Sequence, residues 1–507
     1  MDVTDYIPTD PQETVWDVVV IGTGAGGATA GLDLARLGRS VLFLERGKLW
    51  EQTGSVAREP SFVHSTGTVV SACKPYGLRQ GPYENTRTPE MSMVTGIGGS
   101  TSLFAMVMDR FRPIDFTPHR FAHLSPSTSL PDVWPIQYED LEPYYREAEA
   151  LFRVRGTEDP LTSRPGELLE PPAPSHTETV IHDTLRENGL HPYRLHYARE
   201  NVSECDGCPM RLCDRGCRND AGRICVRPAL EQHGAAILPN CLAVKLEASG
   251  RVVREVICLW NGRYVTIRGR IFVLALNALF TPALLLRSTT ELFPDGLGNR
   301  SGMVGRNLMS HVSDWLSVRF KSPRGVLNEQ LHHGLSINDF YVRDGVKLGN
   351  IHAHAIDFTS FMSKLGPVDG STGTVFFNTI VEDFPYVENR VIPKPATESE
   401  VFWEYRYADE LRFRNQMLLD TFAGSLRPEC DVSICGSSGI LNGSHGCGTC
   451  RFGEDPRSSV LDRENRVHDL DNTYVVDASF FPSSGGINPS LTIVANSLRV
   501  SRLIAAR

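Results

Sequence analysis

The sequence lacks a hydrophobic run long enough to cross a membrane. No stretch of its 507 residues approaches the roughly 18 consecutive apolar residues that a spanning helix needs. Its first residues, MDVTDYIPTDPQETVWD, are acidic and contain neither the basic segment nor the apolar segment of a secretory signal. Internal repeats and low-complexity segments are also missing. We therefore expect a globular protein without a membrane span, located in the cytoplasm.

The chain also lacks an excess of positive charge. Its 51 Lys and Arg residues against 60 Asp and Glu residues give a formal net charge of -9. This balance opposes binding to the phosphates of nucleic acids and to anionic lipid surfaces. We expect no nucleic-acid partner, and the charge is compatible with a cationic small molecule.

Cysteine is concentrated in one short stretch. Of 12 cysteines, four lie in the segment CDGCPMRLCDRGC, namely Cys205, Cys208, Cys213 and Cys217. In a cytoplasmic protein such a group favours metal binding or redox chemistry over disulfides. The spacing C-x2-C-x4-C-x3-C is too compact for a typical zinc site, and iron-sulfur ligands often come in close runs. We predict an iron-sulfur cluster, 3Fe-4S or 4Fe-4S, with zinc or another structural metal and uncommitted thiols as alternatives.

A complete β-α-β unit is predicted near the N-terminus, in WDVVVIGTGAGGATAGLDLARLGRSVLFLERG. An apolar run at 18–21 leads into a glycine-rich turn, a helical pattern and a second apolar run at 41–44. The first glycine permits a tight turn, the second lets the backbone approach a pyrophosphate, and the third allows close packing of helix on strand. An acidic residue after the second strand suits a ribose hydroxyl. These dinucleotide-binding candidates are Gly22, Gly24, Gly27 and Glu45.

A second glycine segment, VTGIGGSTSLF, precedes another apolar run. It is either a tight turn capped by hydroxyls or a second backbone nest against the cofactor. Its candidate cofactor-binding residues are Gly98, Gly99, Ser100 and Thr101.

Near the C-terminus, TYVVDASFFP predicts a strand at 474–476 that ends at Asp477. Asn488 and Pro489 then predict a helix start, with Asn at the N-cap and Pro at the first helical position, and an amphipathic helix through about residue 504. A helix N-terminus directed at a flavin ring would stabilise the reduced, anionic ring.

Taken together, these segments resemble the glucose-methanol-choline (GMC) oxidoreductase family, which binds FAD. The segments VWPIQYEDLEPYYREAE, IFVLALNALFTPALLLRS and GMVGRNLMSH carry the same resemblance, so that it covers nearly the whole chain. It implies an α/β, Rossmann-like FAD-binding domain interleaved with an α+β substrate domain built on an antiparallel sheet. The expected ranges are 1–50, 90–115, 220–310 and 430–507 for the FAD domain, 116–219 for a connecting region with the cysteines, and 310–430 for the substrate domain.

The resemblance also implies an active site. In the family, the histidine of an H-x-x-G-T segment and a His or Asn about forty residues later flank the substrate hydroxyl over the flavin. These positions fall on His445 and Asn488 here. His445 would accept the hydroxyl proton as a general base while a hydride passes to flavin N5. Asn488 would orient the hydroxyl, and Asp477, Asn488 and Pro489 would contact the cofactor.

The iron-sulfur-containing branch of the family implies a dehydrogenase that acts on a sugar or aminosugar, such as the primary 6-hydroxyl of an aminoglycoside. Electrons would leave through the cluster to an external protein, quinone or dye, because the chain has no C-x-x-C-H haem motif. Polar residues that could line the sugar pocket are Asp339, Tyr341, Glu382, Asp383, Glu404 and Tyr405. Two alternatives remain open: an oxygen-using alcohol oxidase with a structural metal or free thiols, and a non-enzymatic flavin redox sensor.

Overall fold

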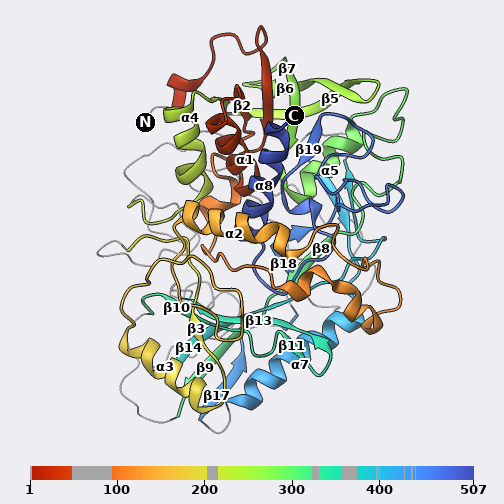
Figure 1. The fold of residues 1–507 in the computed structure, drawn as a ribbon. Helices are drawn as coiled ribbons and strands as arrows, with labels where there is room; N and C mark the ends of the chain where they lie inside the picture. Colours follow the sequence, from red (N-terminus) through yellow and green to blue (C-terminus); the bar gives the residue numbers. More distant parts are fainter. Residues whose placement is uncertain are drawn as a thin grey trace.

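Two β-sheets, one above the other in Figure 1, organise the chain. The computed structural model describes residues 3–47, 94–201, 215–321, 331–354, 374–394, 398, 400–426, 429–435, 438–439 and 441–507.

The upper sheet has the strand order β4-β2-β1-β7-β6-β5, and β19 pairs with β7. Strands β1, β2, β4, β7 and β19 pair in parallel, whereas β5, β6 and β7 form an antiparallel meander. The strands are β1 (Val15–Ile21), β2 (Val41–Leu44), β4 (Ala236–Leu238), β5 (Cys241–Ser249), β6 (Val252–Trp260), β7 (Arg263–Leu274) and β19 (Thr473–Val475).

The predicted β-α-β unit is confirmed as β1, α1 (Ala25–Arg36) and β2, although β1 begins at Val15 rather than at residue 18. Strand β1 lies in the middle of the sheet, and its residues 18–21 are buried. Helix α1 packs against β1 and β2, and the C-terminal helix α8 (Ser490–Ala505) packs against α1. The hydroxyl of Ser497 on α8 donates to the carbonyl oxygen of Gly26 at 2.6 Å. The end of the chain therefore holds the glycine-rich helix in place.

The lower sheet is antiparallel, in the order β17-β9-β14-β13-β10-β3, with β8 joining β14 to β18. Its strands are β3 (Tyr193–Arg194), β8 (Met309–Val312), β9 (Trp315–Phe320), β10 (Gly334–Ile337), β13 (Gly349–His354), β14 (Thr374–Val381), β17 (Cys430–Ile434) and β18 (Leu441–Cys447).

The two faces of the lower sheet differ in polarity. Helices α3 (His176–Glu187) and α7 (Asp409–Ser425) cover the face that lies away from the upper sheet in Figure 1. Ile351 and Ala353 of β13 join these helices in one apolar cluster. Because side chains alternate along a strand, Asn350, His352 and His354 occupy the opposite face. A polar sheet face is thus turned toward the dinucleotide-binding half.

The remaining helices and strands complete the described structure. The other helices are α2 (Tyr138–Phe152), α4 (Arg227–His233) and α5 (Asn277–Arg287), with a π-helix at Gly222–Val226 and 3-10 turns at Val3–Tyr6, Gly99–Ser102, Pro113–Phe116, Pro118–Leu124 and Ala478–Phe480. The other strands form the pairs β11 (Val342–Arg343) with β12 (Val346–Lys347) and β15 (Arg390–Pro393) with β16 (Val401–Glu404).

The sheets also bear on the expected domain ranges. Strands β17 and β18 fall inside the range 430–507 assigned to the FAD domain, yet both pair within the antiparallel sheet. Strand β3, from the connecting region 116–219, is its edge strand. Backbone hydrogen bonds of the antiparallel sheet therefore cross the expected boundaries between the ranges. The domain ranges stay a prediction.

Candidate active site

The first glycine motif forms the turn between β1 and α1. Gly22 has a left-handed φ of 101°, and a Cβ atom there would lie 2.4 Å from the carbonyl oxygen of Ala275. A Cβ at Gly27 would lie 2.1 Å from the carbonyl oxygen of Gly22. At Gly24, in contrast, a Cβ would meet no atom of the described residues within 4 Å. Packing therefore requires the first and third glycines, while the second borders open space.

This open space lies at the N-terminus of α1. Gly24 is the N-cap, and no described side chain caps the helix, so its first N–H groups have no partner within the helix. Such N–H groups and the helix dipole together attract anions. A Cβ at Gly99 would lie 3.0 Å from the Cα of Gly24. The second glycine motif is therefore packed against the first, and the cradle suits a pyrophosphate.

The second motif turns at Gly98, whose φ is 89°, into the short 3-10 helix that contains Ser100. The hydroxyl of Thr101 donates to the carbonyl oxygen of Gly98 at 2.6 Å and accepts from the N–H of Ala221 at 2.9 Å. These bonds brace the turn. Direct contact of Gly98, Ser100 or Thr101 with the cofactor stays a prediction.

Glu45 is buried just after β2 and ties the two glycine motifs together. One carboxylate oxygen accepts from the hydroxyl of Thr23 at 2.5 Å, and the other accepts from the N–H groups of Gly47 at 2.8 Å and Gly96 at 3.0 Å. Burial raises the pKa of this carboxyl above its ordinary value. Its predicted bond to a ribose hydroxyl would be added to these contacts and stays a prediction.

Asp477 follows β19 and is used within the protein. Its carboxylate accepts from the N–H of Asn277 at 3.0 Å, from the hydroxyl of Thr281 at 2.5 Å and from the N–H of Ser479 at 2.9 Å. Burial raises the pKa of Asp477. The residue joins the end of β19 to the start of α5, and a contact with the cofactor stays a prediction.

Asn488 lies immediately before α8, which begins at Ser490 with Pro489 at the N-cap. The helix thus begins one residue later than its sequence pattern predicts, a difference common at helix ends. The Oδ1 atom of Asn488 is buried and has no hydrogen-bond partner among the described residues. Because a buried polar atom without a partner is costly, this amide is suited to bind a ligand.

His445 lies on β18 and pairs with a second histidine that the sequence analysis did not single out. Its Nδ1 is 2.8 Å from the Nδ1 of His311 on β8, and the two rings meet edge to face. The Nε2 of His311 lies 2.9 Å from the carbonyl oxygen of Gly485 and 3.2 Å from that of Ser484. In the sequence, the feature that could have pointed to His311 is the segment GMVGRNLMSH, which ends in this residue and resembles the family.

The carbonyl oxygens fix the tautomers of both rings. A carbonyl only accepts, so the Nε2 of His311 must carry the proton and its Nδ1, in the neutral ring, must accept. His445 must then donate through its Nδ1–H. The Nε2 of His445 is left with a bare lone pair, because the hydrogen bond that this ring makes to a described side chain is at Nδ1. His445 therefore has the form that a general base needs.

Both histidines are held neutral. Burial lowers the pKa of His311 to about 4. Burial, with a smaller contribution from the charge of His311, lowers the pKa of His445 well below 6.5. His352 on β13 makes a further, smaller contribution in the same direction.

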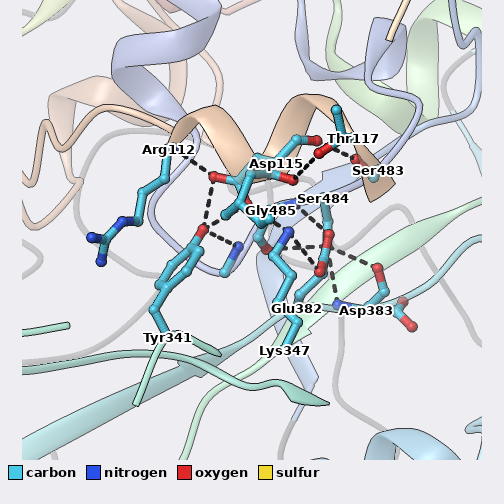
Figure 2. Close-up of polar contacts among 12 residues, drawn as sticks. Arg112, Asp115, Thr117, Tyr341, Lys347, Glu382, Asp383, Ser483, Ser484 and Gly485 are labelled. Atoms are coloured by element: carbon cyan, nitrogen blue, oxygen red, sulfur yellow. Dashed lines mark hydrogen bonds and ion pairs between the residues drawn. The ribbon is translucent and has the colours of Figure 1, made fainter. Parts of the chain in front are cut away.

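The loop that supplies the two carbonyls, residues 483–486, is held by buried polar contacts (Figure 2). The N–H of Gly485 donates to Glu382 at 3.1 Å, and the N–H of Gly486 donates to the hydroxyl of Tyr341 at 2.9 Å. The hydroxyl of Ser484 donates to the carbonyl oxygen of Asp383 at 2.9 Å. The loop is thereby fixed on both sides of the carbonyls that His311 contacts.

A buried ion-pair cluster anchors these contacts, as Figure 2 shows. Lys347 Nζ lies 2.5 Å from Asp115 Oδ1 and 2.8 Å from Glu382 Oε2, and the three side chains are at most 1% exposed. The hydroxyl of Tyr341 donates to Asp115 at 2.8 Å. Removing one member of such a cluster leaves an uncompensated buried charge, so the cluster strongly favours one arrangement of the loop.

The acidic and aromatic residues expected to line a sugar pocket are hydrogen-bonded or ion-paired within the protein, and their contact with a sugar stays a prediction. Tyr341 and Glu382 belong to the cluster, and Tyr405 donates to Asp383 at 2.7 Å. Asp339 pairs with His191 at 2.7 Å, and Glu404 pairs with Arg390 at 2.7 Å.

Three of the four clustered cysteines, Cys205, Cys208 and Cys213, lie outside the described residues. Cys217 is described and buried. Among the described residues, no group of three or more His, Cys, Asp or Glu side chains is placed to hold a metal ion. The predicted iron-sulfur cluster thus has no support in the described part of the chain. There, too, no helix has the length and apolar character to span a bilayer.

The family model described as GMC oxidoreductase matches residues 17–313 and, through its C-terminal counterpart, residues 426–497. The chain belongs to the GMC oxidoreductase family. Membership implies FAD as the cofactor, and the glycine cradle at α1 fits its pyrophosphate. It also confirms the enzymatic class, an oxidoreductase.

Two similar GMC proteins come from Streptomyces. The chain is 32% identical to 6'''-hydroxyparomomycin C oxidase of Streptomyces lividus, over 99% of this chain and 93% of that protein. It is 30% identical to paromamine 6'-oxidase of Streptomyces fradiae, over 98% and 92%. A pyridoxine 4-oxidase structure from Mesorbium loti shares the fold, with a TM-score of 0.67, 20% identity and coverage of 96% of this chain and 99% of that one.

The glycine cradle predicts a contrast between two alanine variants. Gly27→Ala should lower the free energy of unfolding by about 1–3 kcal/mol, because its methyl group collides with backbone. Gly24→Ala should leave the unfolding midpoint of the FAD-free protein unchanged but weaken FAD binding at least about tenfold, because its methyl group enters the pyrophosphate space. Thermal unfolding and flavin titration measure both, and unchanged FAD affinity in Gly24→Ala would refute the cradle.

The lowered histidine pKa values predict the pH dependence of activity. A base must be unprotonated, so a lowered pKa moves the acid limb of kcat/KM below pH 6.5. The side chain of His311→Gln can still accept from the Nδ1–H of His445 but cannot become charged, so the limb should move to higher pH. His182→Gln, at a partly exposed position of α3, is the matched control and should not move it. An acid limb at or above 6.5 in the unaltered enzyme would contradict the assignment.

Proposed function

We propose that this protein oxidises a primary hydroxyl at the 6-position of an aminosugar to the aldehyde, with FAD as cofactor. The names of the two Streptomyces relatives, 6'''-hydroxyparomomycin C oxidase and paromamine 6'-oxidase, support this substrate class. The bare Nε2 of His445 carries the proposal, because it supplies the base that alcohol oxidation needs.

In this proposal the residues of the chain handle the hydroxyl group. FAD, when bound, supplies an oxidised ring that accepts the hydride from the alcohol carbon. His445 Nε2 takes the hydroxyl proton, and the side-chain amide of Asn488 orients the same hydroxyl by hydrogen bonding. His311 continues to accept from the Nδ1–H of His445 and so stabilises the imidazolium that forms. Loss of one hydride and one proton converts the alcohol to the aldehyde.

The electron acceptor has two candidates. Cys205, Cys208, Cys213 and Cys217 favour transfer through an iron-sulfur cluster, 3Fe-4S or 4Fe-4S, to an external protein, quinone or dye. The names of the two similar oxidases favour direct transfer to oxygen. A cytoplasmic location is part of the same proposal.

Turnover of paromamine by the FAD-loaded protein tests the reaction. We expect an aldehyde at the 6'-carbon, identified by a mass lower by two hydrogens and by trapping with a hydrazine. His445→Ala should keep its flavin and lose about 10²- to 10⁴-fold in kcat. His182→Ala is the matched control and should retain full activity. Oxidation at a secondary hydroxyl, or full turnover by His445→Ala, would contradict the proposal.

The same preparation distinguishes the electron routes. Under the cluster route, metal analysis should find about three or four irons per chain, and dyes should be reduced faster than oxygen. An iron-free protein that makes one peroxide for each aldehyde would exclude that route and establish the oxygen-using alternative.

A further inference from the structure

A chain of buried hydrogen bonds runs across the polar face of the lower sheet to His352. Asn338 donates through Nδ2 to Asp159 at 2.9 Å, and Asn350 donates through Nδ2 to the Oδ1 of Asn338 at 2.8 Å. The Oδ1 of Asn350 lies 2.6 Å from the Nδ1 of His352. All four side chains are at least nine-tenths buried.

The carboxylate at one end sets the direction of every bond. A carboxylate only accepts, so Asn338 must present its NH2 group to Asp159 and its carbonyl oxygen to Asn350. Asn350 must in turn present its own carbonyl oxygen to His352. The reverse orientation would point one oxygen at another. His352 therefore carries its proton on Nδ1, and in the neutral ring its Nε2 has a bare lone pair.

This Nε2 atom is buried and has no hydrogen-bond partner among the described residues. The ring is held in place by its bond to Asn350 and by edge-to-face contact with His354, with ring centroids 4.3 Å apart. His354 is itself bonded, through Nδ1, to the hydroxyl of Tyr197 at 2.8 Å. A fixed buried acceptor without a donor is suited to a ligand that brings one.

His352 lies near the proposed base. Strand β13 begins beside the loop that His311 contacts, because a Cβ atom at Gly486 would lie 3.0 Å from the Cα of Gly349. His352 follows three residues later on the polar face of that strand, and its charge would lower the pKa of His445. Burial also lowers the pKa of His352 well below 6.5, so that the ring stays neutral and keeps its lone pair. The region around His445 thus contains two bare imidazole nitrogens, and the proposed reaction uses only that of His445.

We propose that the Nε2 of His352 accepts a hydrogen bond from an ammonium group of the substrate while His445 addresses the hydroxyl that is oxidised. The carboxylate of Asp159, at the far end of the chain, polarises each bond and increases the negative character of Nε2. Such an acceptor binds a charged donor more strongly than a hydroxyl. The inference rests on the proposed function and names the feature that selects an aminosugar over a neutral sugar.

Binding measured without turnover tests this role. All proteins carry His445→Ala, retain FAD, and are titrated calorimetrically with paromamine or with methyl α-glucopyranoside, which has no ammonium group. Adding His352→Phe should weaken paromamine binding by roughly tenfold to a hundredfold, the loss of a hydrogen bond to a charged group. His352→Gln, which keeps an acceptor, should stay within about threefold of the parent. Binding of the glucoside should not change.

The outcomes are distinct from those of the turnover assay. Unchanged paromamine affinity in the Phe variant, equal weakening for both ligands, or no paromamine binding by the parent would each overturn the role of His352. Equal loss of affinity in the Phe and Gln variants would overturn it as well. Failure of the proposed function shows instead as absence of aldehyde in the enzyme with His445 intact. Flavin content and circular dichroism verify that each variant is folded.

Discussion

The contact between the ring of His311 and the carbonyl oxygens of Ser484 and Gly485 determines the chemistry of the candidate site. Two acceptors at Nε2 leave only one tautomer for that ring, and this tautomer dictates which nitrogen of His445 is bare. A neutral histidine in water exchanges between two tautomers, so the protein must select the one with the proton on a given nitrogen. Here backbone oxygens supply it, and they do not titrate in the range where enzymes work.

A loop can impose such a choice only if it cannot move away. Residues 483–486 are held by Glu382, Tyr341 and Asp383, and the first two belong to the buried cluster around Lys347. A buried ion cluster is a poor source of net stability, but it strongly penalises alternative arrangements that would separate its charges. We interpret the cluster as the element that converts a glycine-rich loop into a rigid support. The second polar chain, from Asp159 to His352, applies the same principle on the sheet.

The sequence predicted those features that a single continuous segment encodes. The turn at Gly22, the helix after it and the strand at 41–44 are encoded within one segment, and the structure confirms them. His445 and Asn488 came from a family pattern, and their roles stay predictions. The residues that the sequence analysis did not single out act through partners that are distant in sequence. Lys347 forms ion pairs with Asp115 and Glu382, and the ring of His311 contacts the carbonyl oxygens of residues 484 and 485. The sequence placed Glu382 and Tyr341 at a sugar pocket, because a strand pattern shows that a side chain is polar but not which residue inside the protein it bonds to. In the segment NIHAH, residues 350–354, the alternation of polar and apolar side chains alone predicts that His352 lies on the polar face of its strand.

The most direct test of the central claim is the protonation of the His445 ring itself. In the FAD-loaded protein labelled with ¹⁵N-histidine, two-bond correlation spectra distinguish the protonated nitrogen of a neutral imidazole from the bare one, and loss of one signal set in His445→Ala assigns the ring. The account predicts a neutral ring at pH 7 with the proton on Nδ1 and a bare Nε2. A proton on Nε2, or a charged imidazolium at that pH, would contradict it.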